Sequence, residues 1–173
     1  MKRGKAQVWI ETVIYTLLGL VVIGLLLAFA KPKIDSIRDK SIIEQSLSSF
    51  NSLNAKMEEI EKRGPENSRQ IDMKISRGRL ILDPANDKIS WIIESTYKFS
   101  ELGYVVTWGD LKINTTQKGK KYYVEIFKMY PSNILVNNYD SPKKEIVQSQ
   151  TMYSFIIKNN GISAGKVNLD ISV

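Results

Sequence analysis

The sequence predicts an α+β protein in which a long N-terminal helix is followed by an antiparallel β-sandwich head. An apolar run from Thr12 to Ala30 without charged residues predicts the first part of the helix. An amphipathic pattern that ends near Arg63 predicts the second part. From Gly64 onward, short segments alternate between apolar and polar residues and are separated by turn signals, which is typical of half-buried strands. We therefore expect a helix over 7–63 and a β-sandwich over 64–173.

The apolar run is about as long as a helix that spans a bilayer, which takes roughly 20 residues. Lys2, Arg3 and Lys5 precede it, so its N-terminal side is expected to stay in the cytoplasm. Gly19 and Gly24 lie within the run. They either allow close helix packing or are simply tolerated, as glycine often is in membrane helices, and the sequence leaves both interpretations open.

Beyond the run, Pro32 marks a position where a helix is expected to bend or break. The following apolar residues are spaced alternately by three and four, which predicts an amphipathic helix stopped by Gly64-Pro65. These residues are Ile43, Leu47, Phe50, Leu53, Met57 and Ile60. Because the pattern is too short for a stable coiled coil, we expect this stripe to dock on the head of the same chain.

In the head, the turn signals between the alternating segments predict seven or eight strands. The last stretch, from Tyr153 to Val173, is expected to form two strands joined by a turn at Asn159-Asn160-Gly161. Trp91 and Trp108 are expected in the core.

The composition argues against several classes of function. The chain has no cysteine and no histidine, which removes disulfides, thiolate chemistry and the commonest base and metal ligand. We find no nucleophile with a base, no phosphate-binding loop and no metal-ligand cluster, so we expect neither an enzyme nor a cofactor. The net charge of +7 includes the three N-terminal basic residues, and it does not demand a nucleic-acid partner.

Three features of the head are weaker signals. Asn114 begins an Asn-Thr-Thr sequon, which predicts N-glycosylation or arises by chance. A basic cluster is interpreted as a solvated hairpin tip in preference to an anion-binding surface, and it consists of Lys118, Lys120 and Lys121. An acidic turn is interpreted as an ordinary turn in preference to a calcium site, and it consists of Asp83, Asn86 and Asp87.

The stretch "GKAQVWIETVIYTLLGL" places Glu11 at the start of the apolar run. A carboxylate within a membrane costs a few kcal/mol, so Glu11 is either hydrated at the interface or functional. A secretory signal peptide cut after Ala28-Phe29-Ala30 and an uncleaved anchor both fit the apolar run. Neither of them explains Glu11.

Lys5, Ala6 and Gln7, followed by Glu11 and then the apolar run, resemble the class III signal peptide of archaeal type IV pilins. The resemblance implies that a prepilin peptidase cuts between Ala6 and Gln7, so that residues 1–6 form a leader. It also implies that Glu11 guides assembly. The new α-amino group and Glu11 lie four residues apart on one helix face, and pairing them lowers the cost of burying either charge.

The resemblance thus implies a structural subunit that is inserted in the membrane and then assembles with copies of itself into a surface filament. Its expected partners are those copies, the prepilin peptidase and the membrane. The alternative is a single-pass anchored surface protein with a binding head, or an accessory component of a pilus or archaellum that does not polymerise. An anchored enzyme is the least favoured class.

Overall fold

The computed structural model describes residues 3–140 and 142–173, with side chains from Val8 onward. These residues form one long helix, α1 (Arg3–Arg63), a short 3-10 turn, η1 (Pro84–Asn86), and ten strands. The strands are β1 (Ser68–Met73), β2 (Arg79–Asp83), β3 (Lys88–Ser95), β4 (Val105–Trp108), β5 (Leu111–Lys118), β6 (Lys121–Met129), β7 (Asn133–Val136), β8 (Lys144–Val147), β9 (Tyr153–Ser163) and β10 (Lys166–Ser172). The chain divides into two compact units, Met1–Arg38 and Asp39–Val173.

The second unit contains two open sheets. One has four strands in the order β1-β9-β10-β7, and the other has six strands in the order β4-β5-β6-β3-β2-β8. The pairs are antiparallel except for β10 with β7, which is parallel. The predicted α+β class is therefore confirmed, with antiparallel pairing dominant.

The helix ends where the sequence predicts, at Arg63. Gly64 has a φ of +86°, a left-handed conformation that glycine adopts without steric cost and that commonly ends a helix. Lys62 and Arg63 lie in the last turn, where positive charge interacts favourably with the helix dipole. Pro32 lies inside α1, so the helix does not break at this proline.

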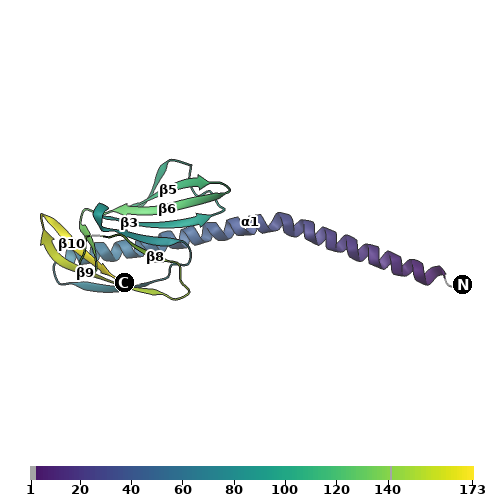
Figure 1. Ribbon diagram of the computed structural model, residues 1–173, viewed down its shortest axis with the longest axis horizontal. Coiled ribbons are helices and arrows are strands. Elements are labelled where there is room, and N and C mark those ends of the chain that lie inside the picture. Colours follow the sequence, from purple (N-terminus) through teal and green to yellow (C-terminus); the bar gives the residue numbers. More distant parts are fainter. Residues whose placement is uncertain (1–2, 141) are drawn as a thin grey trace. The chain divides into compact units, whose positions relative to one another are not determined.

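The amphipathic stripe of α1 docks on the head of the same chain, which confirms the prediction. Its six apolar side chains are at most 2% exposed: Ile43, Leu47, Phe50, Leu53, Met57 and Ile60. They share one hydrophobic core with residues of both sheets, including Trp91 and Ile126 of the larger sheet and Phe155 and Leu169 of the smaller one. In Figure 1 this part of α1 runs along strands of both sheets, so the helix joins the two sheets into one core.

Two predictions about the strands are wrong. The sequence predicted seven or eight strands, whereas the described residues form ten. Three of them, β4, β7 and β8, are only four residues long, too short for a clear alternation.

The prediction that both tryptophans lie in the core is right for Trp91 and wrong for Trp108. Trp91 is buried on the internal strand β3, but Trp108 is 52% exposed because it lies on the edge strand β4.

The predicted turn at Asn159-Asn160-Gly161 is also wrong, since β9 continues through it to Ser163. The hairpin turn lies at Ala164 and Gly165, whose φ values are +50° and +80°. At Gly161, φ is +87°, and the pairing of β9 with β10 shifts between Val167 and Leu169. The Asn-Gly signal therefore marks a β-bulge within a long strand.

Candidate functional site

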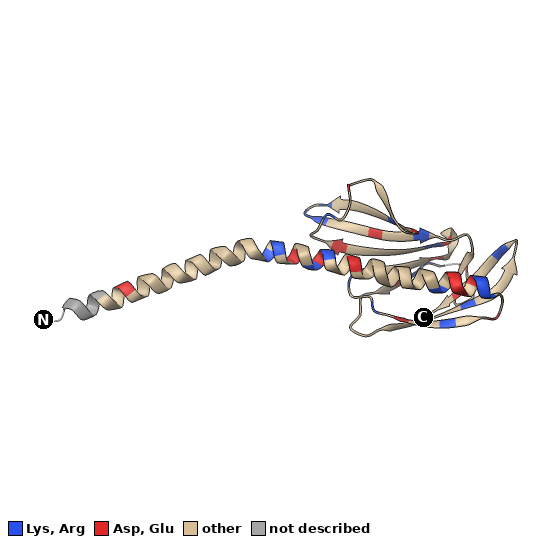
Figure 2. Ribbon diagram, turned by 180° about the vertical axis from the view of Figure 1, so that it is seen from behind, with Lys and Arg blue, Asp and Glu red and all other residues tan. Residues whose placement is uncertain are grey.

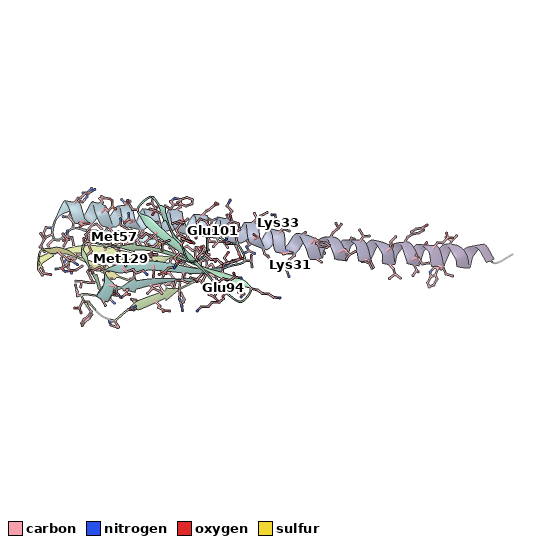
Figure 3. The ribbon with its side chains drawn as sticks, turned by 90° about the horizontal axis from the view of Figure 1, so that it is seen from above. Lys31, Lys33, Met57, Glu94, Glu101 and Met129 are labelled. Carbon is pink, nitrogen blue, oxygen red and sulfur yellow. The ribbon has the colours of Figure 1, made fainter. Side chains whose placement is uncertain are left out.

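The first unit presents an apolar helical surface. From Val8 to Phe29, large apolar side chains are exposed on α1, from 39% for Val13 to 79% for Phe29. Figure 3 shows side chains projecting all around this segment, and in Figure 2 its residues 12–30 have the colour of uncharged residues. By length and composition, α1 is able to cross a membrane. Exposed apolar surface on this scale is unfavourable in water and marks contact with lipid or protein.

The predicted processing site lies in the first turns of this helix. Lys5, Ala6 and Gln7 are helical, but their side chains are outside the described part of the chain. Glu11 is exposed on α1, four residues after Gln7. This spacing places residues 7 and 11 on the same helix face, as the proposed pairing of the amine and the carboxylate requires. Cleavage and pairing both remain predictions.

The two glycines of the apolar segment leave the helix backbone accessible. Apart from the adjacent residues and the backbone of the same helix, a Cβ atom added to Gly19 or Gly24 would meet no atom within 4 Å. A neighbouring helix is therefore able to approach closely at either position, and whether one does so remains a prediction.

Asp39, the first residue of the second unit, anchors the helix to the head. Its carboxylate pairs with Arg77, and it accepts hydrogen bonds from the Thr96 backbone N–H at 2.6 Å and the Thr96 hydroxyl at 2.8 Å. Burial acts to raise the pKa of Asp39, but the bonds from Thr96 and the pairing with Arg77 outweigh it and lower this pKa. Since no local pattern marks a long-range pair, sequence reasoning missed this anchor.

A second set of polar contacts fixes the other end of the docked helix. Lys128 Nζ lies 2.9 Å from Glu58 Oε1, and this hydrogen bond lowers the pKa of Glu58. Ser132 Oγ lies 2.6 Å from Glu61 Oε1. The buried Asn159 donates its Nδ2 to the carbonyl of Ile60 at 3.2 Å, which satisfies a backbone acceptor at the helix end. The docked helix is thus held by polar contacts at both ends.

Asn114 lies on β5, between β4 and β6 in the larger sheet. It is half-buried, and among the described residues its Oδ1 has no hydrogen-bond partner. The next residue, Thr115, is fully buried and lies 2.6 Å from the hydroxyl of Ser100. The sequon is therefore in a strand, and its glycosylation remains a prediction.

The basic cluster lies at the exposed hairpin tip between β5 and β6, as interpreted from the sequence. Lys121 pairs with Glu94, and the hydrogen bond to this carboxylate raises the pKa of Lys121. Lys118 Nζ lies 5.7 Å from the centre of the Tyr123 ring. Two of the three cations therefore have partners on their own sheet, which does not favour an anion-binding role.

The two carboxylates of the acidic turn around η1 contact different partners. Asp83 contacts Lys143 Nζ at 2.8 Å and Asn86 Nδ2 at 2.9 Å. Asp87 accepts from the backbone N–H of Ile134 at 3.0 Å and from Lys166 at 2.9 Å. Within the described residues, no group of three or more acidic, histidine or cysteine side chains is arranged to hold a metal ion.

The described chain therefore combines an exposed apolar helix segment with a head into which residues 39–63 of the same helix are docked. Asn114 lies on β5, the basic cluster at the β5–β6 hairpin and the acidic turn around η1, and none of the contacts described above joins them. Comparisons with protein families, curated proteins and solved structures found no match for this chain.

Proposed function

We propose that the protein is a pilin-like structural subunit of an archaeal surface filament. In this proposal the chain is inserted in the membrane, is cut between Ala6 and Gln7, and assembles through its N-terminal helix. The observation that carries the proposal is the exposed apolar surface of α1 from Val8 to Phe29, on a helix whose later part is docked in the head. The motif from Lys5 to Glu11 supports it.

The apolar surface of α1 must be shielded from water both before and after assembly. In the membrane, lipid tails cover the segment from Val8 to Phe29. In a filament, the same segments of neighbouring copies cover one another, and Gly19 and Gly24 are positions of close approach. The head stays attached throughout because residues 43–60 of the same helix are part of its core.

Glu11 then acts when a subunit leaves the lipid. Cleavage before Gln7 creates an α-amino group that is cationic at neutral pH. A carboxylate buried without a partner is costly, and pairing with an amine of the same or a neighbouring subunit offsets this cost. Glu11 therefore favours the position of the incoming subunit at which its carboxylate pairs with this amine.

A second candidate function is an anchored surface protein whose head binds a ligand and which does not polymerise. The observation that favours it is a polar groove of about 750 Å³ beside η1 and β7.

Processing is tested by expressing the full chain in an archaeal host that matures type IV prepilins and measuring its intact mass. We expect the mature protein to begin at Gln7, and we expect Ala6→Leu to block maturation because a bulky residue occupies the cleavage junction. Ala28→Leu, a matched change at the competing signal-peptide site, should leave maturation unaffected. Retention of Lys2 to Lys5 in assembled protein would contradict the proposal.

Assembly is tested by comparing sheared surface filaments with the membrane fraction. We expect Glu11→Gln and Glu11→Ala to insert in the membrane but to be absent from filaments, because each leaves the amine of Gln7 unpaired. Glu44→Gln is the matched control, since Glu44 lies on the same helix in an exposed pair with Lys40 at 3.7 Å. Equal amounts of parent and Glu11→Ala in filaments would rule out this role for the carboxylate.

A further inference from the structure

The head carries a groove to which the proposed filament function assigns no role. It has a volume of about 750 Å³, within the range of small-molecule sites, and lies between η1 and the strands β7 and β10. Neutral polar side chains line much of it, together with the ring of Tyr139. These polar residues are Asn133, Asn138, Ser163 and Asn168.

A tight turn after β7 holds Asn138 and Tyr139 in place. Val136 and Tyr139 exchange two backbone hydrogen bonds of 2.9 and 3.1 Å, and Asn137 and Asn138 between them have left-handed φ values of +52° and +66°. The buried carboxylate of Asp170 accepts the backbone N–H of Asn138 at 2.6 Å. The turn is therefore built before any ligand arrives, which reduces the ordering cost of binding.

The turn leaves the side chain of Tyr139 68% exposed at the groove. The Oδ1 atom of Asn138 accepts from Asn160 Nδ2 at 2.9 Å, which orients this amide. An exposed ring next to an oriented amide offers both an apolar face and a hydrogen-bond donor.

Asn168 of β10 provides a second oriented amide in the lining. Asn168 Oδ1 accepts from Asn133 Nδ2 and from Ser163 Oγ, each at 2.9 Å. Two donors therefore saturate this oxygen, and the Nδ2 group of Asn168 is the part of the amide that remains for a ligand.

The charges of the lining argue against an anionic ligand. No Lys or Arg belongs to the described lining, so phosphates and carboxylates find no counter-ion there. Of the two carboxylates in the lining, Asp87 is neutralised by Lys166 at 2.9 Å and by the backbone N–H of Ile134, whereas Asp140 adds a negative charge that further disfavours anions. The abundance of amide and hydroxyl groups does not suit a purely apolar ligand.

We propose that this groove binds a neutral saccharide. Sugar hydroxyls both donate and accept hydrogen bonds, as the amides of Asn133, Asn138 and Asn168 do. The apolar C–H face of a sugar ring packs on an aromatic ring such as Tyr139. The inference does not depend on whether the protein polymerises, because the groove belongs to the head alone.

The test is an NMR titration of the full ¹⁵N-labelled chain in micelles of a detergent without a sugar group. The probes are the neutral disaccharides lactose, maltose and cellobiose, with glucuronate and calcium chloride as separate arms. We expect at least one disaccharide to cause saturable shifts of the backbone amides of Asn133, Asn138, Tyr139 and Asn168. We expect glucuronate and calcium chloride to leave them unchanged.

Variants then locate the binding. Tyr139→Ala and Asn138→Gly, which preserves the left-handed backbone, should each weaken binding about tenfold or more, whereas Tyr139→Phe should retain it. Tyr104→Ala is the control, because Tyr104 is 71% exposed outside the groove. The proposal is overturned if no disaccharide shifts these amides, if calcium or glucuronate alone does so, or if Tyr139→Ala and Tyr104→Ala bind alike.

Discussion

At the scale of single residues, Asp39 does more for the docked helix than its position in the sequence suggests. It is 5% exposed, and its carboxylate is shared between Arg77 and Thr96, which lie before β2 and after β3. Because one carboxylate joins the helix to two separate segments of the head, its removal leaves Arg77 and the Thr96 N–H without their acceptor. Such losses are among the costly single changes in proteins.

We therefore predict that Asp39→Ala lowers the free energy of unfolding by about 3 kcal/mol. The measurement is urea unfolding of the full chain in micelles, followed by tryptophan fluorescence. Glu44→Ala, which removes an exposed pair on the same helix, should change the free energy by less than about 0.5 kcal/mol. Equal effects of the two changes would show that Asp39 is not an anchor.

The pKa of Asp39 gives this prediction a pH dependence. Since the folded state lowers the pKa from its ordinary value of 3.8, the stabilisation is complete above that value and is lost as the pH falls through the lowered pKa. Asp39→Asn should therefore lose less stability than the parent protein as the pH falls below 3.8. A parallel decline in both proteins would contradict this assignment.

At the scale of elements, periodic patterns predicted the long helix and its apolar stripe. The edge strands and the long-range contacts could not be predicted from the sequence. The stripe from Ile43 to Ile60 is a local signal because one helix face sets its spacing. Trp108 was misplaced because the order of strands, which puts β4 at an edge, depends on pairings distant in sequence. Likewise, Asp39 and Asn159 become partners of distant segments only in the fold, so no local pattern marks them.

The bulge in β9 is the element that closes the end of the helix. Gly161 donates its backbone N–H to Asn159 Oδ1 at 2.9 Å, and Asn159 Nδ2 in turn reaches the carbonyl of Ile60. We predict that Asn159→Ala costs about 1–3 kcal/mol in unfolding free energy, because buried backbone groups lose a partner. Asn159→Asp should cost more, since it places a carboxylate against carbonyl oxygens at the negative end of the helix dipole.

The neighbouring Asn160 provides the control for this prediction. Its Nδ2 bonds to Asn138 at an exposed site, so Asn160→Ala should change the unfolding free energy by less than about 0.5 kcal/mol. Urea unfolding of the three variants measures their free energies of unfolding. If the Asn159→Ala protein is as stable as the Asn160→Ala protein, Asn159 does not stabilise the end of the helix.

At the scale of the whole molecule, the head does not begin where the sequence pattern changes. The alternation of apolar and polar residues begins after Gly64, but the compact unit runs from Asp39 to Val173. Six side chains of α1 belong to its core, and five of them are among its largest fully buried groups: Ile43, Phe50, Leu53, Met57 and Ile60. Without the helix, residues of both sheets that face it would be exposed to water, at a cost of about 1.5–3 kcal/mol for each large apolar side chain.

We therefore predict that residues 33–173 fold without the apolar segment and that residues 64–173 do not. The longer fragment should give a dispersed NMR spectrum and a cooperative urea transition, whereas the shorter one should give neither. Adding a peptide of residues 36–63 to the shorter fragment should restore dispersion, because it returns the six side chains to the core. The same peptide with Phe50→Ala should restore it less, since a cavity at a buried Phe costs about 3–5 kcal/mol. A folded 64–173 fragment would mean that the two sheets form a sufficient core of their own and that the helix is only an attachment.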